Sequence, residues 1–328
     1  MIKESKICQD AIQKMNLWGM ERKPFIFIID YKLQQPLVLP LHEAAKEGIY
    51  FTFDNLHNID FQNVKKRKFT FRKYPVAYPV FKKSFDRVLA EIKRGNSFLT
   101  NLTFPARIET DLTFPEIFQR SEAPYRMLFK DKFVVFSPEL FITIKGGIIA
   151  SFPMKGTIDA SFADAESMIL NDPKETAEHH TIVDLIRNDL SLVATNVKVE
   201  KFRFINTVKT NDKTLLQVSS EISGQLPHDY YGQLGDILFK LLPAGSISGA
   251  PKRKTLEIIS RSEIYERGYY TGVFGIFDGN NLQSAVMIRF IEKSGAQLIF
   301  KSGGGITALS DPETEYQELI DKIYVPVY

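Results

Sequence analysis

Lys155 stands just after an apolar run, residues 148–152, and lies between Pro153 and Gly156. An apolar run that ends in proline and glycine is typical of a buried strand leaving a sheet. Partial burial of a lysine favours its neutral amine, which is a nucleophile. The alternative is a lysine that extends to the surface at a strand end, and for an isolated lysine that is the better interpretation. The rest of the chain must decide between them.

Three glutamates are candidate ligands for Mg²⁺. Glu315, Glu318 and Lys322 share one face of the last helix, and Glu178 shares a face of another helix with Ile182. Carboxylates are hard oxygen ligands that suit Mg²⁺, and buried carboxylates need a metal or a cation. For the last helix alone, an ordinary Glu318–Lys322 pair on a solvated surface is the preferred alternative. Glu178 shifts the balance slightly toward a metal site.

Arg289 interrupts what otherwise looks like an interior strand at residues 282–291. A guanidinium there needs an anion, either a protein carboxylate, which is the usual case, or a substrate carboxylate held by two hydrogen bonds. Glu139 lies 16 positions before Lys155, on the preceding strand of a predicted hairpin. A carboxyl group at that place can act as a general acid.

Two glycine-rich segments are candidate anion sites. Gly303, Gly304 and Gly305 follow a predicted strand and let backbone N–H groups approach an anion. The loop that carries Ser246 and Ser248 leads into a helix N-terminus, which also favours anions. Together with the lysine and the carboxylates, these segments describe a site for a small dicarboxylate bound with a metal.

Composition places few limits on function. The chain has 328 residues, 44% of them hydrophobic, with a net charge of +3 and one cysteine, Cys8. The net charge is too close to zero to indicate a nucleic-acid-binding protein. A nucleic-acid-binding surface at residues 65–83, whose affinity would depend strongly on salt, is a weak alternative. No apolar run reaches the length of a membrane span and no secretory signal is visible, so we expect a cytoplasmic protein without a disulfide framework.

Hydrophobic periodicity predicts an α+β architecture of short antiparallel strands with helices between them. No linker divides the chain, and we therefore expect a single domain over residues 1–328. Helices are expected at 8–17, 84–94, 113–120, 163–170, 173–189 and 230–241, with two more opened by Pro251 and by residues 310–312. Strands are expected at 25–30, 37–39, 49–53, 97–102, 125–129, 133–137, 139–144, 148–152, 197–204, 215–223, 272–277, 282–291 and 297–301.

Seven ordered motifs resemble those of the chorismate-utilising enzymes: SPELF, PMKGT, AEHHTIVDLIRND, PAGSISGAPK, a strand ending in IRF, SGGGI and EYQELIDKI. The resemblance covers residues 84–328, which would form the catalytic core, whereas residues 1–80 match poorly and are shorter than the family's N-terminal portion. It implies large, mostly antiparallel sheets packed as a sandwich with helices on the outside. The family includes aminodeoxychorismate and anthranilate synthase components I and the isochorismate and salicylate synthases.

Within this family the residue at Lys155 is informative. Aminodeoxychorismate synthases have lysine in their P-x-K-G-T motif, where anthranilate synthases and the others usually have alanine. Isochorismate-forming members use another lysine as a base, and Leu99 stands at that place here. The chain therefore resembles the aminodeoxychorismate synthases, with anthranilate synthase as the alternative.

The resemblance implies a covalent mechanism on chorismate. Lys155 would attack C2 while Glu139 protonates the departing C4 hydroxyl, and ammonia would then add at C4 and expel the lysine. Mg²⁺ would be held by Glu178, Glu315 and Glu318. Because Cys8 lies in no recognisable nucleophile motif, we expect the ammonia to come from a separate glutamine amidotransferase subunit. The residues that the resemblance assigns to substrate binding are Arg289, Lys322, Gly303, Gly304, Gly305, Ser246, Ser248, Thr157 and Gln217.

Two positions depart from the family pattern. Relatives usually have a histidine where this chain has Gln217, and glutamine cannot shuttle a proton at neutral pH. Ser248 stands where threonine is common. The change at Gln217 leaves a second alternative open, a weakly active protein that binds chorismate.

Overall fold

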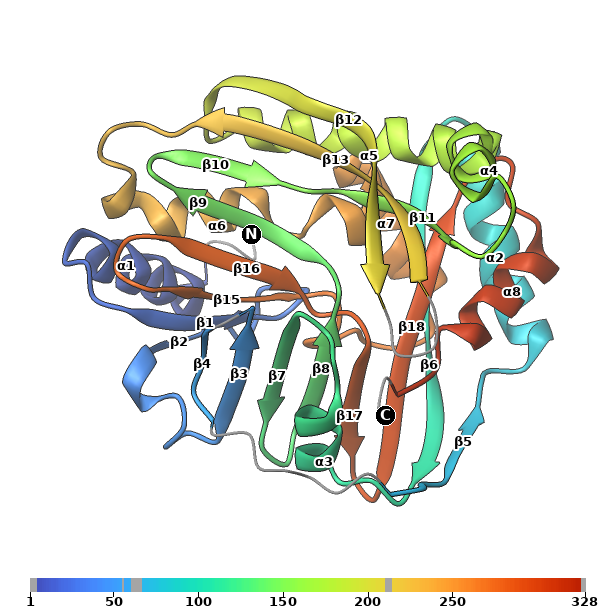
Figure 1. Ribbon diagram of the computed structural model, residues 1–328, viewed down its shortest axis with the longest axis horizontal. Helices are drawn as coiled ribbons and strands as arrows, with labels where there is room; N and C mark the ends of the chain where they lie inside the picture. Colours follow the sequence, from blue (N-terminus) through green and yellow to red (C-terminus); the bar gives the residue numbers. More distant parts are fainter. Residues whose placement is uncertain (1–4, 55, 60–66, 210–213, 326–328) are drawn as a thin grey trace.

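The computed structural model describes residues 5–54, 56–59, 67–209 and 214–325, which form two large sheets flanked by helices (Figure 1). The strands of the first sheet are β1 (Phe25–Ile29), β2 (Leu37–Pro40), β9 (Leu140–Lys145), β10 (Ile148–Ser151), β11 (Met154–Asp159), β12 (Thr195–Lys209), β13 (Thr214–Gln225), β15 (Val273–Phe277) and β16 (Leu282–Val286). The strands of the second sheet are β3 (Ile49–Phe53), β4 (Leu56–His57), β5 (Phe71–Tyr74), β6 (Leu99–Thr110), β7 (Tyr125–Phe129), β8 (Phe133–Ser137), β14 (Gly249–Ala250), β17 (Phe290–Ser294) and β18 (Gln297–Ile306).

The first sheet has the order β11-β13-β10-β9-β16-β15-β1-β2, with β12 also paired to β13. The second has the order β14-β6-β18-β17-β8-β7-β3-β4, with β5 also paired to β6. Every strand pair in the described part of the chain is antiparallel. The predicted α+β architecture of mostly antiparallel sheets is therefore confirmed.

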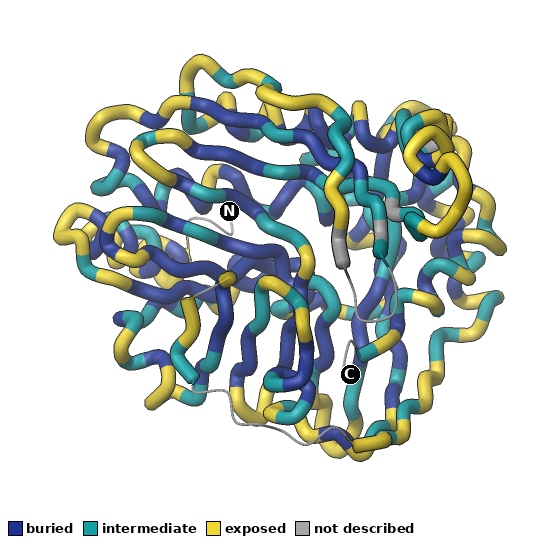
Figure 2. The backbone as a smooth tube through the Cα atoms, in the orientation of Figure 1, coloured by how far each residue is buried: buried dark blue, intermediate teal, exposed yellow. Residues whose placement is uncertain are grey.

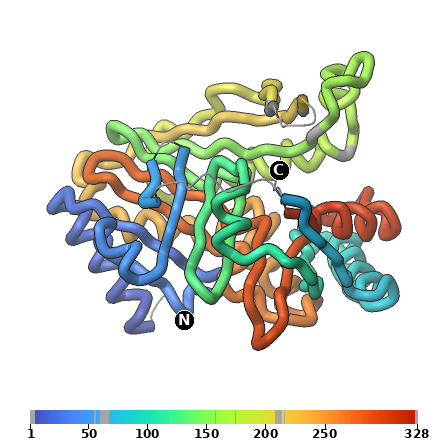
Figure 3. The backbone as a smooth tube through the Cα atoms, turned by 60° about the horizontal axis from the view of Figure 1, so that its bottom comes forward, coloured from blue at the N-terminus to red at the C-terminus, as the bar shows by residue number. Residues whose placement is uncertain are grey.

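The helices are α1 (Lys6–Met20), α2 (Tyr78–Lys93), α3 (Phe114–Arg120), α4 (Ala165–Asn171), α5 (Pro173–Ser191), α6 (Leu234–Leu241), α7 (Lys252–Ser262) and α8 (Pro312–Asp321), with short 3₁₀ turns η2 (Leu41–Glu43), η3 (Tyr230–Gln233) and η4 (Gly245–Ile247). Helices α1, α5 and α6 cover the outer face of the first sheet, and α2, α3, α7 and α8 pack on the second. Figure 3 shows α2 and α8 side by side. No helix in the described ranges is long and apolar enough to cross a membrane.

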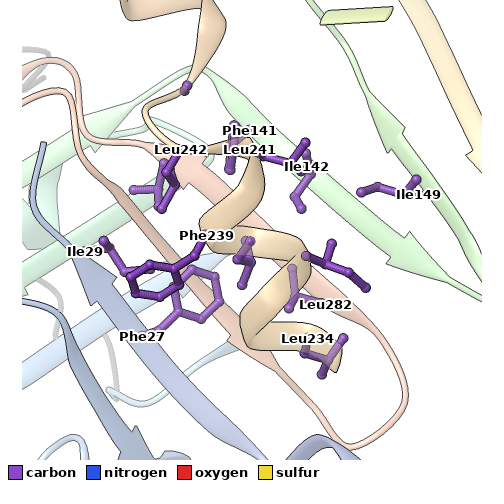
Figure 4. Close-up of a cluster of buried hydrophobic side chains, with 14 of the residues drawn as sticks. Phe27, Ile29, Phe141, Ile142, Ile149, Leu234, Phe239, Leu241, Leu242 and Leu282 are labelled. Carbon is purple, nitrogen blue, oxygen red and sulfur yellow. The ribbon is translucent and has the colours of Figure 1, made fainter. Parts of the chain in front are cut away.

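Central strands such as β1, in which all five residues are buried, are covered on both faces because the sheet lies between two layers. On β1, Phe27 faces the helices while Ile26 and Ile28 face the second sheet. Figure 4 shows Phe27 against Phe239 of α6. Between the sheets, Ile28 joins Phe51 and other buried side chains of the second sheet, and Figure 2 shows the resulting buried interior. The first eighty residues thus contribute strands to both sheets.

Two helices carry the predicted metal ligands, and side chains fix where each begins. Asp172 accepts a hydrogen bond from the backbone N–H of Glu175 at the start of α5, and Pro173 occupies the first turn. Asp311 likewise accepts from the backbone N–H groups of Glu313 and Thr314 at the start of α8. Both starting points agree with the sequence prediction.

Candidate active site

A cavity of about 510 Å³ lies where the two sheets meet. Strands β11 and β18, which are labelled in Figure 1, both contribute residues to its lining. Most of the predicted site residues line it, from both sheets and several loops. The lining residues are Asn101, Pro138, Glu139, Met154, Lys155, Gly156, Glu175, Glu178, Ile182, Gln217, Ser246, Ile247, Tyr270, Thr271, Ile288, Arg289, Gly303, Gly304, Gly305, Glu318 and Lys322.

Glu139 and Arg289 sit where the chain passes from one sheet to the other. Pro138 and Glu139 connect β8 of the second sheet to β9 of the first, and residues 287–289 connect β16 to β17 in the opposite direction. The backbone N–H of Val286 donates to the Glu139 carbonyl over 3.1 Å, so the two crossings are neighbours. This geometry brings both side chains to the cavity.

The prediction of one continuous strand at 282–291 is wrong. The chain leaves the first sheet after Val286 and enters the second at Phe290. Arg289 has a backbone φ of 53°, a left-handed conformation that is uncommon outside glycine. Its Nε donates to the Tyr324 hydroxyl over 3.4 Å, while the residue remains part of the cavity wall.

Lys155 belongs to a second strand rather than to a strand end. Pro153 only interrupts the run, because β10 and β11 pair with successive stretches of β13. The register shifts between Lys155 and Thr157, with Gly156 at a φ of 77° in the resulting bulge. Bulges redirect side chains next to functional sites, and this one places Lys155 in the cavity wall.

The Lys155 Nζ donates to Oε2 of Glu178 over 2.9 Å, and the two side chains are 23% and 5% exposed. Burial acts to lower the pKa of Lys155, but the charge and hydrogen bond of Glu178, helped by Glu175 and Glu318, outweigh it and raise this pKa. The expectation that burial would favour the neutral amine is therefore wrong for this structure. The neighbouring carboxylates hold the lysine as a cation.

Glu139 has the opposite electrostatic character. Burial raises the pKa of its carboxyl group, although the hydrogen bond from Ser246 and the charges of Lys155 and Arg289 act against this. The Ser246 hydroxyl donates to Oε1 of Glu139. A carboxyl group with a raised pKa keeps its proton to higher pH, which suits a general acid.

Gly303, Gly304 and Gly305 lie within β18 rather than after a strand. They pair with Thr103, Leu102 and Asn101 of β6, whereas β17 pairs with β18 only as far as Lys301. One edge of the glycine run is therefore free of strand pairing and borders the cavity. Anion binding by these amides stays a prediction.

Lys322 follows α8 and reaches back to the glycine run. Its Nζ contacts Oε1 of Glu318 at 2.5 Å and donates to the Gly303 carbonyl over 3.0 Å. Burial lowers the pKa of Lys322 and outweighs the attraction of Glu318. The Glu318–Lys322 pair that the sequence alternative placed on a solvated surface thus lines the cavity.

The carboxylates approach the backbone of β18 where no side chain is present. A Cβ atom on Gly304 would lie 3.5 Å from Oε2 of Glu315 and 3.8 Å from Oε1 of Glu318. A Cβ atom on Gly305 would lie 3.3 Å from both Oε2 of Glu178 and Nζ of Lys155. The glycines therefore leave the room that these charged side chains occupy.

The donor chemistry suits Mg²⁺, which usually takes one or two carboxylates together with substrate oxygens. Glu178 and Glu315 are each 4% exposed, and Glu318 lines the cavity. Among the described residues, no three His, Cys, Asp or Glu side chains form a group arranged to hold a metal ion. Binding of Mg²⁺ by these glutamates stays a prediction.

Sequence reasoning missed Glu175, which lies one turn before Glu178 on α5 and also lines the cavity. The i, i+3 spacing of this pair repeats that of Glu315 and Glu318, and this repetition is the signal that could have found it. Asn101, Tyr270 and Thr271 were also missed, and their sequence context carries no comparable signal.

Three further predicted residues differ in their surroundings. Gln217 lines the cavity on β13, where it pairs with Thr157 of β11. The side chain of Thr157 lies outside the described part of the chain. Ser248 is fully buried and donates to the Ala244 carbonyl over 2.9 Å, so it supports its own loop and is not part of the cavity lining.

The model of the chorismate binding enzyme family matches residues 51–327 of the chain. The chain belongs to this family. It is 50% identical to an uncharacterized PabA-like protein of Pasteurella multocida over 96% of this chain and 98% of that protein. It is 30% identical to aminodeoxychorismate synthase component 1 of Bacillus subtilis over 74% of this chain, and it spans 54% of the length of that protein.

The fold is that of solved structures of chorismate-utilising enzymes. The menaquinone-specific isochorismate synthase MenF of Escherichia coli superposes with a TM-score of 0.72 at 17% identity, over 96% of this chain and 80% of that one. The predicted fold class is thereby confirmed. The family match identifies the protein as a chorismate-binding enzyme.

Proposed function

We propose that this enzyme aminates chorismate at C4 to give 4-amino-4-deoxychorismate, on the route to para-aminobenzoate and folate. The observation that carries the proposal is Lys155, whose amine borders the same cavity as Glu139. A lysine amine is a nitrogen nucleophile that can form a covalent bond to an electrophilic carbon of the substrate. The resemblance of its P-x-K-G-T motif to the aminodeoxychorismate synthases supports the same reaction.

The proposed reaction has two displacements. Lys155 first gives a proton to one of the neighbouring carboxylates that hold it as a cation. Its neutral nitrogen then forms a bond to C2, the ring double bonds shift, and the C4 hydroxyl leaves as water with a proton from Glu139. Glu139 is reprotonated by the proton that the bonded nitrogen releases. Ammonia then bonds to C4, the double bonds shift back, and the C2–N bond to Lys155 breaks. The sum is chorismate and ammonia giving aminodeoxychorismate and water. Covalent catalysis of this kind replaces one difficult displacement with two easier ones.

Substrate carboxylates have cationic partners in the cavity. Arg289 offers a planar fork that can hold a carboxylate with two hydrogen bonds, and Lys322 offers an ammonium group. Glu178, Glu315 and Glu318 would hold Mg²⁺, with Glu175 close by. When bound, Mg²⁺ supplies positive charge that offsets these carboxylates and orients a substrate carboxylate.

Ammonia is proposed to come from a separate glutamine amidotransferase subunit, with both proteins in the cytoplasm. The glutaminase reaction of such subunits uses a reactive cysteine. Cys8 is fully buried on α1, and its thiol donates to the Leu33 carbonyl over 2.8 Å. Buried cysteines of this kind are inert, so this chain does not supply that nucleophile.

Gln217 favours a second candidate, a relative that binds chorismate with weak turnover. Its side chain belongs to the cavity wall where relatives usually carry histidine, and an amide cannot transfer protons as histidine does. Anthranilate synthase is a further alternative, but anthranilate synthases usually have alanine where this chain has Lys155.

The test is to incubate the protein with chorismate, Mg²⁺ and isotope-labelled ammonium, and in parallel with glutamine alone. We expect labelled aminodeoxychorismate from ammonium and no amination from glutamine until an amidotransferase subunit is added. Labelled anthranilate or unlabelled isochorismate would contradict the proposed reaction. Binding of chorismate without consumption would favour the weakly active relative.

A further inference from the structure

Arg267 lies just after α7 and does not line the cavity, yet its side chain is only 1% exposed. Its guanidinium is held by Glu263, with Nε at 2.9 Å from Oε2 and Nη2 at 2.6 Å from Oε1. The Glu263 carboxylate also accepts from the backbone N–H and the hydroxyl of Thr103 on β6, over 2.9 and 2.7 Å. The position of the arginine is therefore fixed from the second sheet.

The remaining Arg267 donors reach three segments of the cavity wall. Nη1 donates to the Ile247 carbonyl over 2.9 Å and to the Thr271 hydroxyl over 3.2 Å. Nη2 donates to the Asn101 carbonyl over 2.8 Å. Ile247, Thr271 and Asn101 all line the cavity, although they are far apart in the sequence.

Each of these segments adjoins a residue of the proposed chemistry. Ile247 follows Ser246, whose hydroxyl donates to Glu139. Asn101 pairs across β6 and β18 with Gly305, which borders Lys155. Thr271 leads into β15 and borders the Arg289 crossing, because its backbone N–H donates to the Met287 carbonyl over 2.8 Å.

We infer that Arg267 is a positioning residue that sets the distance between the Ser246 loop, the Asn101 strand and the Thr271 turn. The inference rests on the proposed chorismate site. A planar guanidinium can donate in several fixed directions at once, whereas a lysine ammonium is a single point that cannot span these acceptors. Small displacements of catalytic groups reduce rates strongly, so loss of the fork acts on catalysis through the cavity wall.

A purely structural role would have a different signature. If Arg267 only stabilised the fold, its replacement would reduce the fraction of folded molecules, and the remaining molecules would have the wild-type KM for chorismate. A positioning role changes the folded molecules themselves. KM and kcat per folded molecule therefore separate the two roles.

The test compares R267K with the double variant R267M/E263Q, which removes both members of the buried pair so that neither charge is left alone. R120K is the matched control, because Arg120 is also buried but lies outside the cavity lining. Chorismate consumption is assayed for each variant at matched folded fraction. The folded fraction is measured by near-ultraviolet circular dichroism.

We expect R267K, or the double variant if R267K does not fold, to lose roughly 10²-fold in kcat/KM with a raised KM. R120K should keep the wild-type KM and kcat. Folded Arg267 variants with wild-type KM and kcat per folded molecule would overturn the inference. A wild-type protein that neither binds nor consumes chorismate would instead refute the proposed function.

Discussion

Replacement of Lys155 by alanine tests the covalent route and has a stability cost that the structure lets us anticipate. The variant removes the proposed nucleophile, and loss of a nucleophile costs on the order of 10⁴-fold or more in kcat. It also leaves Glu178, 5% exposed, without the cation at 2.9 Å. Breaking a fully buried pair costs about 3–5 kcal/mol, and the 23% exposure of Lys155 reduces this to about 2–4 kcal/mol.

A loss of that size lies within the stability of an ordinary domain, so we expect K155A to remain folded. K252A is the matched control, because Lys252 and Asp189 form a pair at 2.5 Å with 20% and 14% exposure and Lys252 does not line the cavity. Chorismate consumption with Mg²⁺ and ammonium is measured for both, with thermal unfolding alongside. Unchanged turnover in folded K155A would refute the covalent mechanism, and an equal loss in K252A would assign the effect to destabilisation.

Three further predictions concern Glu139, the glycine run and the metal. Burial raises the pKa of Glu139, and a general acid must be protonated, so activity should fall as pH rises through this raised pKa. E139Q should lose roughly 10²–10⁴-fold in kcat and should also lose that limb of the pH profile. An E139Q variant that keeps both the activity and the limb would contradict the role. A Cβ on Gly305 would lie 2.9 Å from Cδ1 of Leu99 and 3.3 Å from Nζ of Lys155, so G305A should reduce turnover. G232A is the control, because a Cβ on Gly232 would meet nothing within 4 Å, and it should keep its turnover. Equal activities of the two variants would show that the space at β18 is unimportant. Dialysis against EDTA should abolish chorismate consumption and added Mg²⁺ should restore it, and activity that persists without metal would remove the glutamates from that role.

Local signals predicted much of the fold. Asp172 and Pro173 mark the start of α5, and alternating apolar residues mark the short strands, because caps and periodicity depend on neighbours in the sequence. The Lys155–Glu178 contact joins residues 23 positions apart on a strand and a helix, and no local pattern encodes it. The sequence predicted the burial of Lys155. It did not predict the raised pKa of Lys155, because that pKa depends on the contact with Glu178.

The strand crossing at Arg289 shows a different limit. Residues on both sides of the crossing are buried, as Val286 and Phe290 are, so their apolar pattern continues while the chain changes sheets. Sequence periodicity reports burial and does not report which sheet a strand joins. The position of Arg289 in the cavity wall follows from the crossing and therefore required the structure.

The most direct test of the central claim is to identify the atom of the protein that bonds to chorismate. Protein incubated with chorismate and Mg²⁺ but without ammonia is quenched, digested and mapped by mass spectrometry. The proposed mechanism predicts an adduct with the mass of chorismate less one water on Lys155, which is lost when ammonium is added before quenching. An adduct on another residue, or amination of chorismate at full rate by K155A, would contradict it.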